Sequence, residues 1–135
     1  MVYHQAFILK SDNYTKPVNQ LNYFPGSRHY SRLVKQKNIA AVEIHKEVTI
    51  EKYRCEFNCE MISEDTQQIN DFSVLSFENQ LSLSIITSQI NDYGFEFNRF
   101  SLRNAYDVFL LSKKVDAIKT ISKFPKLKNP LNCFL

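Results

Sequence analysis

The chain has 135 residues, 44% of them hydrophobic and 23% charged, with 17 Lys and Arg against 14 Asp and Glu. This length and composition are typical of a globular domain with its own core, and they exclude a wholly disordered or fibrous protein. The two glycines, Gly26 and Gly94, cannot build a glycine-rich phosphate loop, so nucleotide binding by a P-loop or dinucleotide fingerprint is excluded.

The charges are distributed unevenly along the sequence. Residues 1–37 carry six cations and one anion, residues 38–104 carry five cations and eleven anions, and residues 105–135 carry six cations and two anions. Both ends are therefore basic and the middle is acidic. Such segregation favours binding to macromolecules of complementary charge.

The N-terminal third alternates between regular and irregular segments. Val2–Lys10 is rich in β-forming residues and ends at a turn signal, which predicts a first strand. It lacks the basic leader and small-residue cleavage site of a signal peptide. Residues 11–27 hold two prolines and a glycine and are predicted to form a long irregular loop. Ser27–Lys37 follows as a predicted short helix with a serine cap.

The middle of the chain is predicted to form strands. Residues 41–61 alternate apolar with polar residues, and a change of parity near Glu51 predicts two or three strands separated by bulges or turns. Residues 69–92 fit both helical spacing and alternation. Strands with a turn near residues 78–80 are favoured there because serine and β-branched residues are weak helix formers.

The C-terminal third contains the clearest helical pattern, from about Ser101 to Ser122. Residues 124–135 include two prolines and are predicted to be an extended tail. The sequence therefore predicts one α+β domain over residues 1–135, an antiparallel sheet of about five to six strands with a C-terminal amphipathic helix packed on one face. The helix stripe expected to face the sheet consists of Ala105, Val108, Phe109, Val115, Ile118 and Ile121.

The first candidate site is a basic and aromatic segment within residues 23–37. Cations there could neutralise phosphates while aromatic rings stack on bases, as in proteins that bind single-stranded nucleic acid. The segment is also suited to an anionic surface of another protein. The residues expected to contact a partner are Tyr23, Phe24, Arg28, His29, Tyr30, Arg32, Lys35 and Lys37.

The second candidate site is an acidic face on the strands predicted within residues 43–60. Acidic side chains alternate with apolar ones there, which places them on the solvent side of a sheet. Such a surface repels nucleic acid and attracts a basic protein groove. This acidic face consists of Glu43, Glu47, Glu51, Glu56 and Glu60.

No pattern indicates a metal, a cofactor or a catalytic group. Cys55 and Cys59 would lie about 13 Å apart on one strand, too far to share a metal ion. Three cysteines without a framework spacing favour reduced thiols in an intracellular, cytoplasmic setting. No carboxylate pair and no nucleophile with a histidine can be identified from the spacing. We therefore expect no catalytic residue, no metal and no cofactor.

The sequence thus favours a small non-enzymatic interaction or regulatory protein that binds a macromolecular partner, with a protein partner expected first. No membrane is expected to be its partner, because no apolar run approaches roughly 18 residues. The bias toward Lys, Asn and Ile fits an accessory protein or inhibitor from a virus or mobile element. Two alternatives stay open: a nucleic-acid-binding domain that uses residues 23–37, and a small enzyme whose site is assembled in space.

Overall fold

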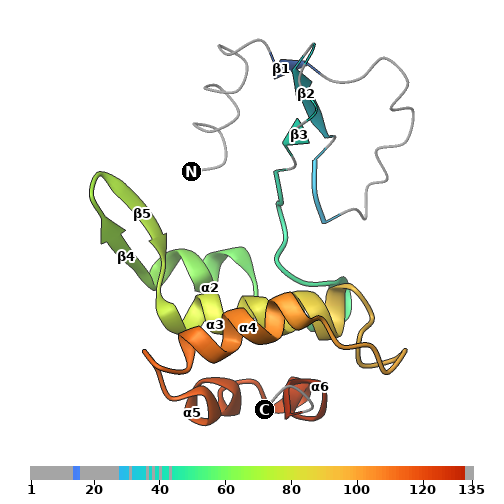
Figure 1. Ribbon diagram of the computed structural model, residues 1–135, viewed down its shortest axis with the longest axis vertical. Coiled ribbons are helices and arrows are strands. Elements are labelled where there is room, and N and C mark those ends of the chain that lie inside the picture. Colours follow the sequence, from blue (N-terminus) through green and yellow to red (C-terminus); the bar gives the residue numbers. More distant parts are fainter. Residues whose placement is uncertain are drawn as a thin grey trace. The chain divides into compact units, whose positions relative to one another are not determined.

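The computed structural model describes residues 14–15, 28–30, 32–35, 37, 39, 41–42 and 44–132. The chain divides into two compact units, residues 1–47 and residues 48–135, and each is described by itself. The protein is mixed helix and strand, as an α+β class predicts, and the described strands form two small antiparallel sheets (Figure 1). The organisation of residues 1–135 as a single domain stays a prediction.

The described strands of the first unit are short. β1 (Tyr14–Thr15), β2 (Leu33–Lys35) and β3 (Ala41–Val42) pair antiparallel in the order β1-β2-β3. His29, before β2, and His45, after β3, form an isolated antiparallel bridge. The first unit therefore has a narrow sheet with β2 at its centre.

The short helix predicted over Ser27–Lys37 is wrong, because residues 33–35 form β2. A single short helix gains little from its own hydrogen bonds in water, whereas β2 has a strand on each side. Part of the irregular loop predicted at residues 11–27 is β1. The rest of that loop and the predicted strand Val2–Lys10 lie outside the described residues.

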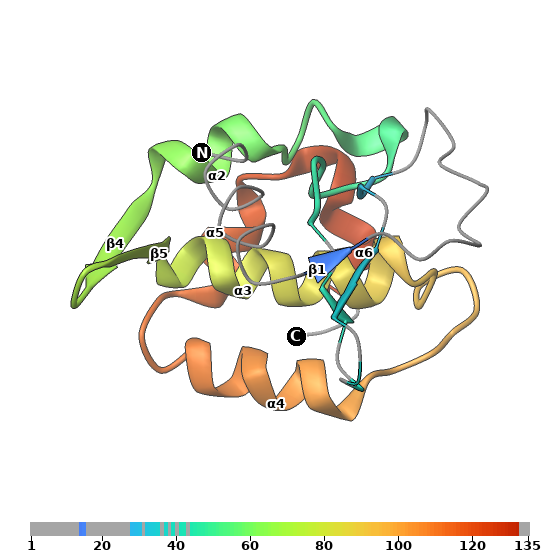
Figure 2. The same ribbon diagram turned by 90° about the horizontal axis from the view of Figure 1, so that it is seen from above.

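The second unit is mainly helical. In Figure 2, α3 runs between α2 and α4, and α4 lies at one edge of this unit. The short element η2 is a π-helical turn that continues α3, and η1 and η3 are single 3-10 turns. The elements in chain order are η1 (Glu51–Tyr53), α2 (Cys59–Glu64), β4 (Thr66–Ile69), β5 (Phe72–Leu75), α3 (Phe77–Ile86), η2 (Thr87–Asn91), α4 (Leu102–Leu111), α5 (Ala117–Ser122), η3 (Pro125–Leu127) and α6 (Lys128–Asn132).

Helices α2 to α5 all begin at a side-chain cap. In each, the capping oxygen accepts a hydrogen bond from the backbone amide three residues on, at 2.9–3.3 Å. A cap of this kind stabilises a helix by about 1 kcal/mol, because it satisfies an amide that has no partner within the helix. The four caps are Asn58, Ser76, Ser101 and Asp116.

The hydrophobic core of the second unit surrounds α3. Leu81, Ile85 and Ile86 on that helix are fully buried. The rings of Phe57 and Phe124 meet edge to face with their centroids 5.4 Å apart, which joins the segment before α2 to the segment after α5. The buried apolar residues are Val48, Phe57, Leu81, Ile85, Ile86, Ile90, Val108, Ile121, Phe124, Leu127 and Leu131.

The predicted single sheet of five to six strands beneath a C-terminal helix is wrong. After β3 the chain passes through the η1 turn into α2 instead of continuing as strands to residue 61. Residues 77–91 form α3 and η2, because their helical spacing places Leu81, Ile85 and Ile86 on the buried side. The serines are accommodated by backbone contacts: Ser82 Oγ donates to the Glu78 carbonyl at 2.9 Å.

The helix predicted from Ser101 to Ser122 is divided into α4 and α5, because the Asp116 side chain caps a new helix. The extended tail predicted at residues 124–135 is also wrong where the structure describes it, since η3 and α6 occupy residues 125–132. Leu127 and Leu131 are fully buried there. Pro125 is tolerated because it stands first in η3, where its missing amide is not needed.

Candidate interaction surface

Helix α4 has apolar residues on two faces. Toward the core, Val108 is 4% exposed, and Ala105 and Leu111 pack against the buried cluster. The other face carries large apolar side chains that are 43–79% exposed, at a spacing of four, three and one residues, which places them on one side of the helix. We call this face the α4 stripe. It consists of Leu102, Tyr106, Phe109 and Leu110.

A polar contact near the start of α4 fixes which face meets the core. Ser101 Oγ accepts from the Asn104 amide at 3.3 Å and donates to Asn104 Oδ1 at 2.8 Å. Asn104 Nδ2 then donates to the carbonyl of Ser84, on α3, at 2.7 Å. Rotation of α4 about its axis would break this contact. The fold therefore holds the α4 stripe toward solvent.

The loop of residues 93–100, which leads into α4, also presents aromatic side chains. Its backbone is anchored: the Gly94 amide donates to the Ser88 carbonyl at 3.0 Å, and the Arg99 amide donates to the Gly94 carbonyl at 2.8 Å. A Cβ at Gly94 would lie 2.5 Å from the Ser88 carbonyl oxygen, so this position needs glycine. The exposed aromatic residues of the loop are Tyr93, Phe95, Phe97 and Phe100.

Cations accompany these exposed apolar residues. The Lys113 ammonium lies 4.2 Å from the centroid of the Phe109 ring, and the Arg99 guanidinium lies 5.3 Å from that of Phe97. Such cation–π contacts stabilise exposed sites by about 0.5–1 kcal/mol. The charged residues of segment 93–114 are Arg99, Arg103, Lys113 and Lys114 against Glu96 and Asp107. The surface is therefore apolar with a net basic margin.

Sequence patterns assign part of this surface wrongly. Phe109 and Ile118 were expected to face a sheet, yet they are 55% and 73% exposed. Val108 and Ile121, from the same predicted stripe, are buried as expected. The missed signal is that apolar residues surround much of α4, which is more than a helix with one buried face requires.

The basic and aromatic segment lies in the first unit, and its start is paired with residues 44–47. The Tyr30 amide donates to the Ile44 carbonyl at 2.8 Å, and the amides of Lys46 and Glu47 both donate to the Arg28 carbonyl, at 2.9 and 3.0 Å. The structure thus brings the backbone of this segment beside Glu47, which the sequence assigned to the acidic face.

The side chains of this segment differ in exposure. Tyr30, Arg32 and Lys37 are exposed, whereas Arg28, His29 and Lys35 are half-buried. The His29 and His45 rings meet edge to face with centroids 5.6 Å apart. Tyr23 and Phe24 lie outside the described residues. A role of the whole segment in binding stays a prediction.

The predicted acidic face does not lie on the solvent side of a sheet. Glu51 is in η1, Glu56 is in the turn that follows it, and Glu60 is on α2, so these three carboxylates do not alternate along a strand. Glu47 belongs to the first unit, and Glu43 lies outside the described residues. The segment that alternates in sequence folds as turns followed by a helix, and neither keeps every second side chain on one face as a strand does.

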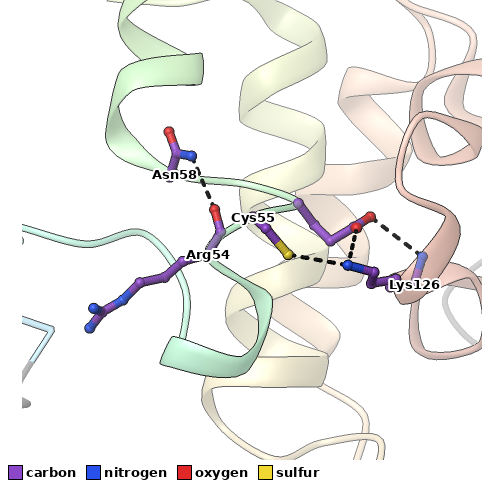
Figure 3. A network of polar contacts seen from close by, with 5 residues as sticks. Arg54, Cys55, Asn58 and Lys126 are labelled. Carbon is purple, nitrogen blue, oxygen red and sulfur yellow. Dashed lines mark hydrogen bonds and ion pairs between the residues drawn. The ribbon is translucent and has the colours of Figure 1, made fainter.

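Glu56 is engaged inside the second unit. Its Oε1 lies 3.5 Å from the Lys126 ammonium, and its Oε2 accepts from the Lys126 amide at 3.4 Å. The Lys126 ammonium also lies 3.4 Å from the Cys55 sulfur (Figure 3). Nearby, Asn58 Nδ2 donates to the Arg54 carbonyl at 3.0 Å. Glu56 therefore joins the turn before α2 to η3 and is not a member of an open acidic surface.

The contact with Cys55, and then the charge of Glu56, raises the pKa of Lys126 above its ordinary value. A raised lysine pKa means that the charged form is favoured in the folded state. The resulting stabilisation is present throughout the neutral range and is lost as the pH rises through the raised pKa. Because Lys126 is well exposed, this effect is strongly screened by solvent.

Cys55 and Cys59 do not lie on one strand, since Cys55 is in a turn and Cys59 begins α2. Within the described ranges, no three or more His, Cys, Asp and Glu side chains are grouped so that they could hold a metal ion. The expected absence of a metal, a cofactor and a catalytic residue stays a prediction.

None of the helices that the structure describes is both long and apolar enough to cross a membrane. Comparison of the chain with protein-family models, with curated proteins and with solved structures found no match.

Proposed function

We propose that this chain is an interaction protein that binds a macromolecular partner, most directly another protein, through the α4 stripe. The observation that supports this proposal is the exposure of Leu102, Tyr106 and Phe109 on a helix whose other face is in the core. These three side chains are 55–79% exposed, so they add little buried apolar area to the core of the second unit. Exposed apolar patches on soluble domains mark interaction sites.

The composition and rigidity of the surface fit this role. Aromatic residues are enriched at the centres of protein interfaces, where they bury large areas with little loss of side-chain freedom. Helix α4 is held by Asn104, and the loop before it by the backbone contacts of Gly94. A surface that is ordered before binding loses less conformational entropy when a partner arrives.

A photo-crosslinking experiment tests the proposal. A photoreactive amino acid replaces Tyr106, and in a matched control it replaces Gln68, an exposed residue on the β4–β5 hairpin. Illumination of the full chain in an extract of its source cells is expected to give a discrete macromolecular adduct from position 106 and none from position 68. Equal adducts from both positions, or none from position 106, would contradict the proposal.

A second candidate function is nucleic-acid binding by the basic and aromatic segment, favoured by the exposure of Tyr30, Arg32 and Lys37. Binding that neutralises phosphates weakens steeply as the salt concentration rises. If the segment has this role, titration of a fluorescent single-stranded oligonucleotide should show that dependence, and Arg32→Ala should weaken binding. A flat salt response would remove this candidate.

A further inference from the structure

The next inference rests on the proposed function and specifies the partner. We propose that the α4 stripe binds an amphipathic helix of another protein, with an apolar face that packs on the stripe and an acidic polar face. The proposal combines three features of α4: the spacing of its exposed apolar residues, the charges at both of its ends, and the poor fit of a second copy of the chain.

The spacing of the α4 stripe matches the way helices pack on one another. Leu102, Tyr106, Phe109 and Leu110 form a band along nine residues, or about 12 Å of helix. A helical partner with apolar residues at the same spacing can pack its side chains into the grooves between these residues. Since α4 lies at the edge of the second unit with α3 on its inner side (Figure 2), a further helix would extend the packing outward.

The charges around the stripe favour an acidic partner. Arg103 is exposed at the start of α4, and Lys113 and Lys114 are exposed just after its end. The first turn of α4 contains no acidic residue that would offset the positive end of the helix dipole. Carboxylates on a bound helix would meet cations at both ends of the stripe, which raises the association rate and fixes the orientation.

A second copy of this chain fits the surface less well. A symmetric dimer uses the same surface patch twice, so the patch must complement itself. If two α4 helices pack antiparallel, Arg103 of each meets Lys113 and Lys114 of the other. If they pack parallel, the like residues meet directly. Both arrangements bring cations together, with only Asp107 on α4 to offset them.

Nucleic acid and lipid also fit the surface less well. Leu102 and Leu110 offer no ring on which a base could stack, and the Phe109 ring already carries the Lys113 ammonium at 4.2 Å. Between Arg103 and Lys113 the chain contains no cation, so a continuous row of phosphates, from either ligand, would find no charged partner along the stripe. Binding of either ligand is measured in the experiments that follow.

The test measures binding of designed helical peptides to the full chain. The probe has leucines at the spacing of the α4 stripe and glutamates on its polar face, and the matched peptide has lysines in place of the glutamates. We expect the glutamate peptide to bind at least about tenfold more tightly than the lysine peptide at low salt. Tyr106→Ser should weaken binding of the glutamate peptide by about 30-fold or more, as expected for an aromatic anchor.

Charge variants sharpen the test. Arg103→Glu should weaken binding of the glutamate peptide and strengthen binding of the lysine peptide. Lys128→Glu, on α6, should leave the binding of both peptides unchanged. Thermal denaturation of each variant shows whether it remains folded. Equal binding of the two peptides, or no measurable binding of the glutamate peptide, overturns the proposal.

Parallel measurements identify the other occupants. A dimer in sedimentation velocity, or binding to anionic vesicles or to a thymidine oligonucleotide, overturns the proposal if Tyr106→Ser abolishes it. An adduct from position 106 together with no peptide binding rejects the acidic helix and keeps the interaction role. Absence of the adduct rejects both.

Discussion

Helices α3 and α4 depart from the usual distribution of residues in opposite directions. Buried positions of α3 and its π-helical continuation include polar residues, namely Ser82, Ser88, Gln89 and Asn91. Exposed positions of α4 are largely apolar. The two helices pack against each other, and Asn104 joins them by a hydrogen bond to α3. The two helices therefore share one environment, and they differ in which residue types they bury and which they expose.

The fold accounts for the first departure and not for the second. Ser82 Oγ donates to the Glu78 carbonyl, and Asn91 Nδ2 donates to the Val48 carbonyl at 2.9 Å, so these two donor groups are satisfied where they are buried. Nothing comparable explains why Leu102 and Tyr106 remain exposed. The polar residues of α3 serve the structure, and the apolar residues of α4 are available for binding.

The largest expected effect follows from removing a side chain at the centre of α3. Ile85→Ala should lower the free energy of unfolding by about 2–5 kcal/mol, because it leaves a cavity beside a fully buried side chain. The matched control is Ile118→Ala on α5, where the isoleucine is exposed, and it should change the same quantity by less than about 0.5 kcal/mol. Urea denaturation measures both, and similar losses would contradict the assignment of α3 to the core.

The next effect concerns the turn between the two helices. Gly94→Ala should lower the free energy of unfolding by about 1–3 kcal/mol, because the new Cβ would overlap the Ser88 carbonyl oxygen. In the same loop, Asn98 has φ = 50°, so Asn98→Gly should be neutral or slightly stabilising. Denaturation curves compare the two variants. A neutral Gly94→Ala would show that the loop is not held as described.

A smaller effect is expected for a buried polar side chain. Asn91→Ala removes the hydrogen bond to the Val48 carbonyl, but it also removes Oδ1, which is buried and accepts no hydrogen bond from the described residues. The two changes partly offset each other, so the net loss should be about 1 kcal/mol. Asn132→Ala, at an exposed position, is the control. A loss above about 3 kcal/mol would mean that Oδ1 has a partner in the folded protein.

The sequence correctly predicted the start of α4 and two of the buried positions on the C-terminal helices. Ser101 was expected to begin a helix, and it caps α4. Val108 and Ile121 were expected to face the interior, and both are buried. A capping residue and the period of a helix act within a few residues of the chain, so the sequence alone reveals them.

Residues 77–91 were predicted wrongly because their pattern fits a helix and a strand equally well. The choice between them depends on distant residues: Phe57, Leu127 and Leu131 are buried in the same cluster as Ile85. The buried Ser82 and Gln89 further resemble solvent-facing positions. Neither the packing partners nor the satisfied polar groups can be recognised from a local period.

The α4 stripe was missed for a related reason. When Ser101–Ser122 is taken as one helix, a single stripe through Val108, Phe109 and Ile121 supplies the buried face, and the apolar residues outside that stripe are overlooked. The break before Asp116 ends that register, and the contact of Asn104 with α3 decides which face of α4 is buried. The sequence shows that α4 has two apolar faces, but the buried one is chosen by tertiary contacts.

The contrast between α3 and α4 predicts that a substitution in the α4 stripe has almost no effect on stability. Tyr106→Ser should change the free energy of unfolding by less than about 0.5 kcal/mol, because the ring is exposed and the two residues have similar helix propensity. Urea denaturation measures this change, and the large loss expected for Ile85→Ala provides the contrast. If Tyr106→Ser destabilises the chain by more than about 2 kcal/mol, the ring is part of the core and the α4 stripe is not an open surface.

The smallest effect on stability has an unusual sign. Arg103→Glu places an anion in the first turn of α4, which favours the helix dipole by about 0.3–1 kcal/mol, while repulsion from Asp107 four residues on removes about 0.2–0.5 kcal/mol. The net change in the free energy of unfolding should be a gain of a few tenths of a kcal/mol, with a loss of binding to the glutamate peptide. Arg103→Gln, which removes the cation without adding an anion, should be intermediate in both measurements. A variant that is more stable yet binds less shows that Arg103 is placed for a partner, whereas a clear loss of stability would show that it supports the fold.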